Sequence, residues 1–326
     1  MLNVKRYCNR CINKCSTEPK CKVIDLVLQR DRLEGIVYIG VMSTEQRPLH
    51  HVNPGTRLLR IVLPGAIVDA SDLWWNSFSD VDNLVIRSID ELRLKSILAR
   101  VRPSTVLIDG CEPLILDYTI KLMKIIRRIS TGFNIALGVK TCGMVDIERL
   151  KHSIDEVNPD FILFEYLGNI ITDIKIVKAS MKFLQEVMQI FKGVLEILLY
   201  IDNNKLFYAT LKRIADILKS RCVVHLVPLS STSDDALNKA YRIAYELRSK
   251  RVNVYLYNDT SYTLTDTLCP YCGNILVERK PWGVSIRGRL LGNFKLQCPN
   301  CKHVYEHIIC LKMPERILPH REIVVW

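Results

Sequence analysis

The sequence has no long apolar run and no hydrophobic segment near its start. A membrane-spanning helix needs about 18 or more consecutive apolar residues, and no such stretch occurs in the 326 residues. The opening MLNVKRYCNRC reaches a cysteine pair before a secretory signal could form. We therefore expect a cytoplasmic protein without a membrane span, in which the thiols stay reduced.

Common catalytic signatures and disordered linkers are also missing. The chain contains no Gly-x-Ser-x-Gly, no Walker loop and no His-Glu-x-x-His, and 138–141 (GVKT) matches only the end of a phosphate-binding loop. No low-complexity or Pro/Gly-rich tract occurs. Hydrophobic residues make up 48% and charged residues 25%, which excludes a mainly disordered or fibrous chain.

What the chain does have is charge and cysteine concentrated at its two ends. The net charge is +12, and there are 12 cysteines. Residues 1–60 contain 11 basic and 5 acidic side chains and residues 269–326 contain 9 and 4, so the segment between them is nearly neutral. Only three cysteines lie in that segment, namely Cys111, Cys142 and Cys222. Basic, cysteine-rich ends therefore flank a neutral core.

The core alternates short β-branched runs with longer segments of helical periodicity. Apolar residues recur at helical spacing in 117–130 and 234–249. Repeated βα units predict an α/β fold with a parallel sheet that is covered on both faces or closed into a barrel. The predicted strands are 57–63, 105–109, 133–139, 160–165, 194–200, 222–227 and 252–257. We divide the chain into an N-terminal segment (1–56), a core (57–262) and a C-terminal module (263–326).

The C-terminal cysteines have the spacing of a metal site. Cys269-Pro-Tyr-Cys272 and Cys298-Pro-Asn-Cys301 are two C-x2-C pairs, and each pair brings two thiolates to one ion. Four thiolates around a tetrahedral ion predict a closed structural zinc site of the ribbon type. The nearby Cys310, His303 and His307 are possible spare ligands, but we expect them to be ordinary surface or packing residues.

A second cysteine cluster lies near the start of the chain. Cys8, Cys11, Cys15 and Cys21 form C-x2-C-x3-C-x5-C, which can wrap around one ion. Zinc is the first prediction, because the cluster looks closed and structural. An iron–sulfur cluster is the alternative, since dense short spacings suit it too, and the spacing does not separate the two.

With these features in view, the chain resembles a family. It is similar to the radical S-adenosylmethionine (SAM) proteins of the AmmeMemoRadiSam type, relatives of pyruvate formate-lyase activating enzyme. The segments that carry the resemblance are the front cysteines, EQRPLHHVNPGTRLLRI (45–61), GCEP (110–113), VVHLVP (223–228), VYLYN (254–258) and CPYCGNILVER (269–279). The resemblance implies a partial (βα)6-type parallel barrel, flanked by an N-terminal metal-binding segment with four cysteines and a C-terminal zinc ribbon. It also implies a vestigial SAM site at Gly110, Glu112 and Pro113.

The chain departs from that family after the first barrel strand. The family has a C-x3-C-x2-C triplet there, which holds an iron–sulfur cluster, but this chain has Ala66, Ala70 and Leu73. None of these side chains can ligate iron, so we expect the radical chemistry to be absent. Cys111 also stands where the family has a second glycine, which weakens the SAM site.

Polar residues at the ends of the predicted strands are the remaining candidates for chemistry. Catalytic groups on parallel barrels gather at the carboxyl ends of the strands. Each of these residues also has a structural explanation: a turn at Asp109, a lysine pair for Glu165, and a hydrogen-bonded core position for His225. The candidates are Asp109, Glu112, Lys140, Glu165, Asp202 and His225.

These features favour a catalytically inactive radical SAM homologue that works by binding. Basic side chains on metal-held modules suit the phosphate backbone of structured RNA or the ribosome. Aromatic residues at the ends could stack on bases, and they are Tyr7, Tyr271, Trp282, Phe294 and Tyr305. A solvated basic surface explains the same charge. Two alternatives are an enzyme that uses the SAM pocket for non-radical chemistry and a protein-complex scaffold that replaces an active homologue.

Overall fold

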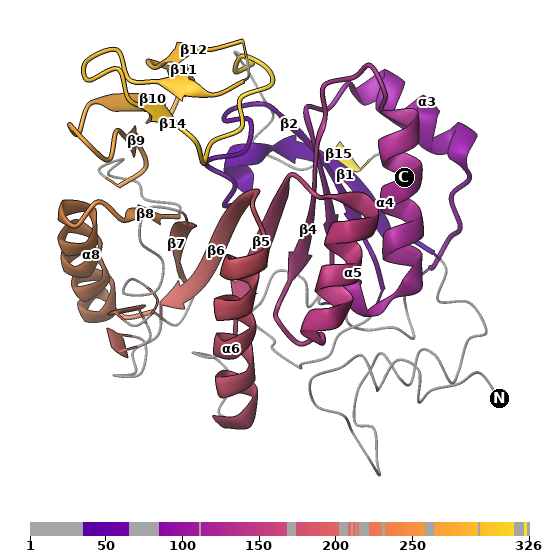
Figure 1. Cartoon of the computed structure of the whole chain (residues 1–326), viewed down its shortest axis with the longest axis horizontal. Helices are drawn as coiled ribbons and strands as arrows, with labels where there is room; N and C mark the ends of the chain where they lie inside the picture. The colour runs from indigo at the N-terminus through magenta and orange to yellow at the C-terminus, as the bar shows by residue number, and fades with distance from the viewer. Residues whose placement is uncertain are drawn as a thin grey trace.

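The computed structural model describes residues 35–64, 85–110, 112–167, 174–201, 208–209, 211–212, 214, 222–229, 232–257, 264–292, 294–315 and 323–324. Its main sheet has nine strands in the order β15-β1-β2-β3-β4-β5-β6-β7-β8 (Figure 1). Each strand from β2 to β8 runs parallel to the next one. Their bounds are β2 Arg57–Val62, β3 Thr105–Asp109, β4 Ala136–Thr141, β5 Phe161–Tyr166, β6 Val194–Ile201, β7 Cys222–Pro228 and β8 Asn253–Leu256.

The α/β fold with a parallel sheet is confirmed, because each of the seven predicted runs overlaps one of these strands, with ends that differ by up to three residues. Two antiparallel strands that the sequence did not predict extend one edge, β1 (Tyr38–Ser43) and β15 (Ile323–Val324). In the strand order, β15 and β8 stand at opposite ends of the sheet, so the sheet is open and forms a partial barrel. The boundaries at 56 and 262 stay predictions.

Within the described residues, five helices of eleven or more residues cover one face of the sheet. They are α3 (Glu91–Val101), α4 (Asp117–Ile129), α5 (Ile147–Val157), α6 (Ile174–Ile190) and α8 (Asp234–Ser249). Figure 1 shows α4, α5 and α6 side by side along the sheet, as expected when successive crossovers between parallel strands share one handedness. Alternate strand residues such as Val106 and Ile108 meet helix residues such as Met123 and Ile126 in a continuous apolar core. None of the helices that the structure describes is long and apolar enough to cross a bilayer.

The opposite, inner face of the sheet is filled by the segment that joins β1 to β2. This segment includes a short 3-10 helix (Thr44–Gln46), and its Leu49 and Val52 pack with inner-face residues of the strands. The backbone nitrogen of His51 donates to Glu196 of β6 at 2.7 Å, so the segment crosses the sheet to the far strands. Part of the inside of the barrel is therefore occupied by this segment. A second 3-10 helix (Pro113–Ile115) follows β3.

The C-terminal module consists of two small antiparallel sheets, seen at the upper left of Figure 1. The module docks on the 44–56 segment, where Asn53 accepts from Leu311 through Oδ1 and donates its backbone nitrogen to Ile309, both at 2.7 Å. Asn53 also donates to Ser104, just before β3, so the module sits at the amino ends of the strands. The strands of the module are β9 Thr267–Leu268, β10 Ile275–Lys280, β11 Gly283–Ile286, β12 Arg289–Leu290, β13 Leu296–Gln297 and β14 Val304–Tyr305.

Candidate functional sites: a cysteine centre and two buried polar clusters

The four C-terminal cysteines come together in one group. The sulfur atoms of Cys269, Cys272, Cys298 and Cys301 all lie within 4.8 Å of one another. Two of the sulfur–sulfur distances, Cys269 to Cys301 and Cys272 to Cys298, are 3.5 Å. A tetrahedral zinc ion with bonds of about 2.3 Å separates its sulfurs by about 3.8 Å, so the group fits a four-thiolate metal ion.

The two C-x2-C turns have matching backbone geometry. The nitrogen of Gly273 donates to the carbonyl of Cys269 at 2.9 Å, and that of Lys302 donates to the carbonyl of Cys298 at 3.0 Å. Gly273 and Lys302 both have positive φ, 72° and 61°. This conformation suits glycine but is unfavourable for lysine by about 1–2 kcal/mol. The second turn keeps the conformation although lysine occupies it.

The four thiols differ in their surroundings. Burial raises the pKa of Cys269 to about 12, whereas a backbone hydrogen bond from Asn274 lowers the pKa of Cys272 to about 6. A bound metal ion would hold all four sulfurs as thiolates, because it competes directly with protons. The N-terminal cysteines Cys8, Cys11, Cys15 and Cys21 lie outside the described residues.

The three neighbouring residues named as possible spare ligands have other contacts. The Cys310 thiol is buried, and burial raises its pKa to about 11. The ring of His303 packs on Tyr271 with a centroid distance of 3.9 Å, and the carbonyl of His307 contacts His51 Nδ1 at 3.0 Å. Among the described residues, only the four paired cysteines form a group that could hold a metal ion.

A buried charged cluster lies toward the carboxyl ends of β4, β5 and β6. Lys140 forms an ion pair with Glu165 and donates to the carbonyl of Gly110 at 2.6 Å. The hydroxyl of Tyr200 and the thiol of Cys142 also donate to Glu165, the thiol at 3.4 Å. Burial and the nearby Glu165 carboxylate raise the pKa of Tyr200 well above its ordinary value, so it remains a proton donor.

The predicted SAM residues sit beside this cluster, at the end of β3. Gly110 has φ of 133°, and a Cβ atom there would lie 2.9 Å from the carbonyl oxygen of Leu63. Glu112 Oε2 accepts from Thr141 Oγ1 at 2.9 Å and from two backbone nitrogens of the loop after β4. Glu112 Oε1 is buried without a hydrogen-bond partner among the described residues, and burial raises the pKa of Glu112 to about 7. Pro113 begins the following 3-10 helix.

The structure thus brings four of the six predicted strand-end candidates together, namely Asp109, Glu112, Lys140 and Glu165. Asp109 is buried and pairs with Arg60 of β2 at 2.8 Å. His225 lies apart from them, in the middle of β7. Asp202, Cys111 and the three positions of the missing cluster ligands (Ala66, Ala70 and Leu73) lie outside the described residues.

His225 belongs to a second polar cluster on the inner face. His225 Nε2 lies 2.6 Å from Glu196 Oε2, and its ring meets the edge of His50 at a centroid distance of 4.7 Å. His51 Nε2 lies 2.6 Å from the hydroxyl of Tyr255. Burial lowers the pKa of His51 to about 4 and that of His225 to about 3, so both rings are neutral near pH 7. The cluster connects the 44–56 segment to the strands of the barrel, and we call it the joint. Its contacts agree with the prediction that His225 is a hydrogen-bonded core residue.

Arg279 of the C-terminal module completes this joint. Its guanidinium donates to Glu45 and to the carbonyl of His50, both at 2.7 Å, and to Thr265 and Thr267 of its own module at 2.9 Å. The sequence interpretation missed this role. A signal was available for the histidine side of the joint: Glu196 is an acidic residue inside the apolar run VLEILLY, and a buried carboxylate needs a partner, which here is His225.

No protein-family model and no curated protein matches the chain. Among solved structures it is similar to SuiB of Streptococcus suis, with a TM-score of 0.45 and 9% identity over 65% of this chain and 50% of that one. SuiB bound to S-adenosylmethionine has a TM-score of 0.42 and 11% identity, and the match covers 59% of this chain and 50% of that one. SuiB bound to its precursor peptide SuiA has the same TM-score and identity, and the match covers 56% of this chain and 45% of that one. The chain thus spans about half the length of these structures or slightly less.

Proposed function

We propose that this chain is a cytoplasmic, catalytically inactive relative of radical SAM enzymes that binds structured RNA, such as ribosomal RNA, through a zinc-held C-terminal module. The observation that carries the proposal is the exposure of large aromatic side chains on this small module. Trp282 at the tip of the β10–β11 hairpin is 79% exposed, Tyr271 is 57% exposed and Phe294 is 37% exposed. The exposed parts of these rings add nothing to the core of the module, and exposed aromatic rings stack well on nucleic-acid bases.

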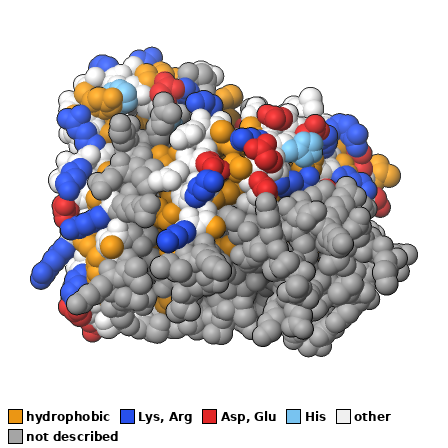
Figure 2. All heavy atoms as spheres, turned by 60° about the horizontal axis from the view of Figure 1, so that its bottom comes forward, with side chains coloured by type: hydrophobic (Ala, Val, Ile, Leu, Met, Phe, Trp, Pro, Cys, Tyr) orange, Lys and Arg blue, Asp and Glu red, His pale blue; other side chains and the backbone are white. Residues whose placement is uncertain are grey.

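The module also carries exposed basic side chains, two of which pair with glutamates (Arg287 with Glu278 and Lys312 with Glu315). Arg287 and Lys312 are 59% and 46% exposed, and Arg289 is exposed as well. Lys and Arg side chains stand out along the left of Figure 2, the side where Figure 1 places α8 and the module. Exposed basic residues of α8 and the turn after it, Arg242, Lys250 and Arg251, extend the basic surface toward the barrel. Such a surface suits a phosphate backbone.

Two of the aromatic residues predicted to stack on bases do not support the proposal. Tyr305 is 3% exposed and packs with Leu276, Val277 and Leu296 in the core of the module, so its ring is not available to a base. This part of the prediction was wrong, because the local sequence does not show which aromatic ring a small module buries. Tyr7 lies outside the described residues.

Zinc is the ion we propose for the four-cysteine group, and its role is structural. All four positions of a tetrahedral ion would be filled by sulfur, which leaves none for water or substrate. Module strands of two to six residues bury too few side chains to be stable without such a link. The ion would hold Tyr271, which lies between two of the ligands, on the surface where RNA binds.

The absence of radical chemistry rests on the sequence after β2. Ala66, Ala70 and Leu73 offer no ligand to iron. The mutual pairing of Lys140 with Glu165 and of Arg60 with Asp109 is consistent with this proposal, because these inward-facing charges neutralise one another.

The test is binding of bulk RNA and of purified ribosomes over a range of salt concentrations. We expect affinity to fall steeply with salt, and we expect Trp282→Ala to weaken it by roughly 5- to 100-fold, the loss of one stacked base. Phe133→Ala is the matched control, because Phe133 is a 42% exposed aromatic residue on the barrel. Absence of salt-sensitive binding at low ionic strength would refute the proposal, and capture of a protein without RNA would favour the scaffold alternative.

One observation favours a second candidate, a protein that binds SAM for non-radical chemistry. Glu112 Oε1, which has no hydrogen-bond partner among the residues that the structure describes, lies in a buried site beside Gly110 and could accept from the ammonium group of an amino acid. Calorimetry with SAM tests this directly. Binding that Glu112→Gln abolishes would support it, and neither heat nor a thermal shift with the unaltered protein would exclude it.

A further inference from the structure

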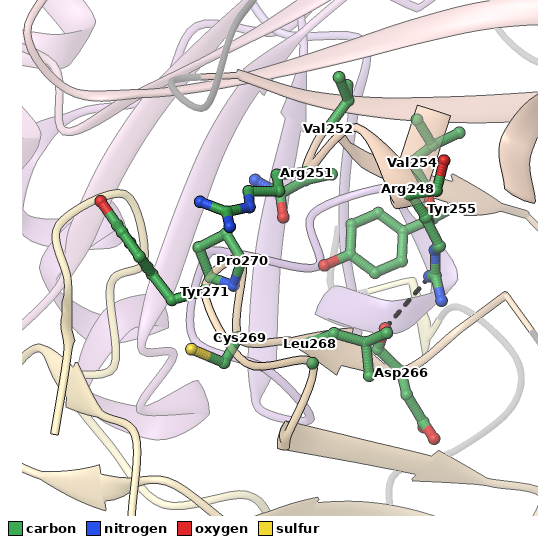
Figure 3. Close-up of a pocket in the computed structure, with 13 residues that line it drawn as sticks. Arg248, Arg251, Val252, Val254, Tyr255, Asp266, Leu268, Cys269, Pro270 and Tyr271 are labelled. Carbon is green, nitrogen blue, oxygen red and sulfur yellow. Dashed lines mark hydrogen bonds between the residues drawn. The ribbon is translucent and has the colours of Figure 1, made fainter. Parts of the chain in front are cut away.

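A small cavity lies between the barrel and the first cysteine turn, which we call the junction pocket (Figure 3). Its volume is about 220 Å³. This is below the roughly 300–1,000 Å³ of sites for drug-sized ligands, so the pocket suits a single flat ring and not a whole cofactor. The residues that matter here are Arg248, Arg251, Tyr255, Asp266, Pro270 and Tyr271.

Arg251 occupies an unusual backbone position at the rim. Helix α8 ends in a turn in which the nitrogen of Val252 donates to the carbonyl of Leu247 at 3.0 Å. The residue before Val252 in such a turn is usually glycine, because it takes a left-handed conformation. Here it is Arg251, with φ of 66°. The guanidinium carbon lies 5.6 Å from the ring centroid of Tyr271, and the side chain forms no ion pair within the described ranges.

Tyr271 forms the other part of the rim. It is 57% exposed, and His303 supports its ring at a centroid distance of 3.9 Å. Figure 3 shows Arg251 reaching toward Tyr271 across Pro270. A planar guanidinium and an aromatic ring held together at a pocket form a stacking platform for another flat ring.

Arg248 has a different role from Arg251. Its guanidinium donates to the carbonyls of Val254, Leu264 and Asp266 at 2.7–3.1 Å, and the contact to Asp266 is drawn in Figure 3. These bonds make Arg248 a fixed wall of the pocket. Arg251 is therefore the arginine whose guanidinium remains available to a ligand.

We propose that the junction pocket binds one unstacked nucleobase, with Tyr271 and Arg251 as the stacking platform and the Arg251 charge toward the neighbouring phosphate. This inference rests on the proposed RNA-binding function and names the element that the pocket recognises. The base belongs either to a single-stranded RNA segment or to a free nucleotide, since both present the same ring and phosphate. Single-stranded RNA is recognised in this way, by aromatic and arginine planes that take up splayed bases.

The experiment measures the affinity of the full chain for fluorescent 12-nucleotide oligo(U) and oligo(A), and of AMP and UMP by calorimetry. Arg251→Gly removes the guanidinium and relieves the left-handed backbone, so we expect about tenfold weaker binding without a lower melting temperature. Tyr271→Ala weakens binding roughly 5- to 100-fold and Tyr271→Phe restores it, with equal zinc content in both variants.

Two matched controls separate the pocket from charge and exposure in general. Arg102→Gly changes an arginine in the same left-handed conformation (φ 49°) at the end of α3, and Tyr245→Ala removes a 51% exposed tyrosine of α8. We expect both to bind RNA like the unaltered protein. Neither residue lines the junction pocket.

Each outcome decides a different point. Weaker oligonucleotide binding by Arg251→Gly and Tyr271→Ala but not by the controls supports the pocket within RNA, and the same pattern with AMP or UMP alone assigns it to a free nucleotide. If the unaltered protein binds RNA and both pocket variants bind equally well, the junction pocket is refuted while the proposed function stands. If the unaltered protein binds neither RNA nor nucleotide, both proposals fail.

Discussion

Different interactions stabilise the partial barrel and the C-terminal module. The helix-covered face of the barrel buries a continuous apolar set in which every strand from β2 to β8 takes part. The module has a core of eight buried residues, and three of them are cysteines, namely Cys269, Cys298 and Cys310. We therefore expect apolar burial to be sufficient for the barrel, and we expect the module to depend on its four-cysteine group and on its contacts with the barrel.

The joint between the two regions differs from both. It consists of buried hydrogen-bonded groups, with Arg279 of the module reaching Glu45 and His50 of the barrel side. Polar joints fix a relative position, because every donor must meet its acceptor. We infer that the joint sets the position in which the barrel holds the module.

The largest effect should come from breaking the cysteine group. We expect Cys298→Ser to lose the metal and unfold the module, because a metal-bound module folds only with its ion. Metal content by mass spectrometry and hydrogen exchange of 264–315 measure this. Cys310→Ala is the control, since Cys310 is buried in the same core but lies outside the four-cysteine group, and it should keep its metal. A module that stays folded without metal would contradict the expectation that it depends on its ion while the barrel does not.

Removing Arg279 should have the next largest effect. Arg279→Met leaves Glu45 and several buried acceptors without their partner, and breaking such a pair typically lowers the free energy of unfolding by about 3–5 kcal/mol. Arg287→Met is the matched control on the surface, where its pair with Glu278 is exposed and contributes at most about 1 kcal/mol. Chemical denaturation gives the free energy of unfolding of both variants. Equal decreases would show that Arg279 contributes no more to stability than an exposed ion pair does.

Acid should weaken the joint. The folded-state pKa values of His51 and His225 are lowered to about 4 and 3, and that of His50 is lowered well below its ordinary value. The unfolded chain therefore takes up these protons first, and stability falls as the pH drops from about 6.5 toward 4. The raised pKa of Glu196, about 7, acts in the opposite direction above pH 4.5 and offsets part of this loss.

His50→Phe tests the direction of this pH dependence. It keeps an aromatic ring and removes one of the titrating groups, so the slope of unfolding free energy against pH should decrease by roughly one proton below pH 6. His152→Phe, outside the joint on α5, is the control for replacing a histidine by phenylalanine elsewhere in the chain. If His50→Phe leaves the slope of unfolding free energy against pH unaltered, the loss of stability in acid does not come from the joint.

The sequence predicted the barrel strands because their β-branched runs are continuous, and it predicted the cysteine group because C-x2-C spacing is a local pattern. The joint could not be found in this way. The His51–Glu196 and Glu45–Arg279 contacts connect residues far apart in the sequence. The sequence around one residue of such a pair does not indicate which distant residue it will contact. The sequence did not predict strand β1, because its apolar run YIGVMS is short and interrupted by glycine.

The smallest effect on stability should come from Trp282. Because its ring is 79% exposed, Trp282→Ala should change the free energy of unfolding by no more than about 0.5 kcal/mol, while RNA affinity falls. Chemical denaturation together with the binding measurement separates a surface built for a ligand from one that supports the module. A large loss of stability would assign Trp282 to folding.

The central claim is that the metal-held module binds RNA, and salt-dependent RNA binding by Cys298→Ser beside Cys310→Ala tests it most directly. We predict that the unaltered protein and Cys310→Ala bind with the same steep dependence on salt, while Cys298→Ser loses most of its affinity and retains the parallel sheet of the barrel. RNA binding by Cys298→Ser equal to that of the unaltered protein would contradict the claim.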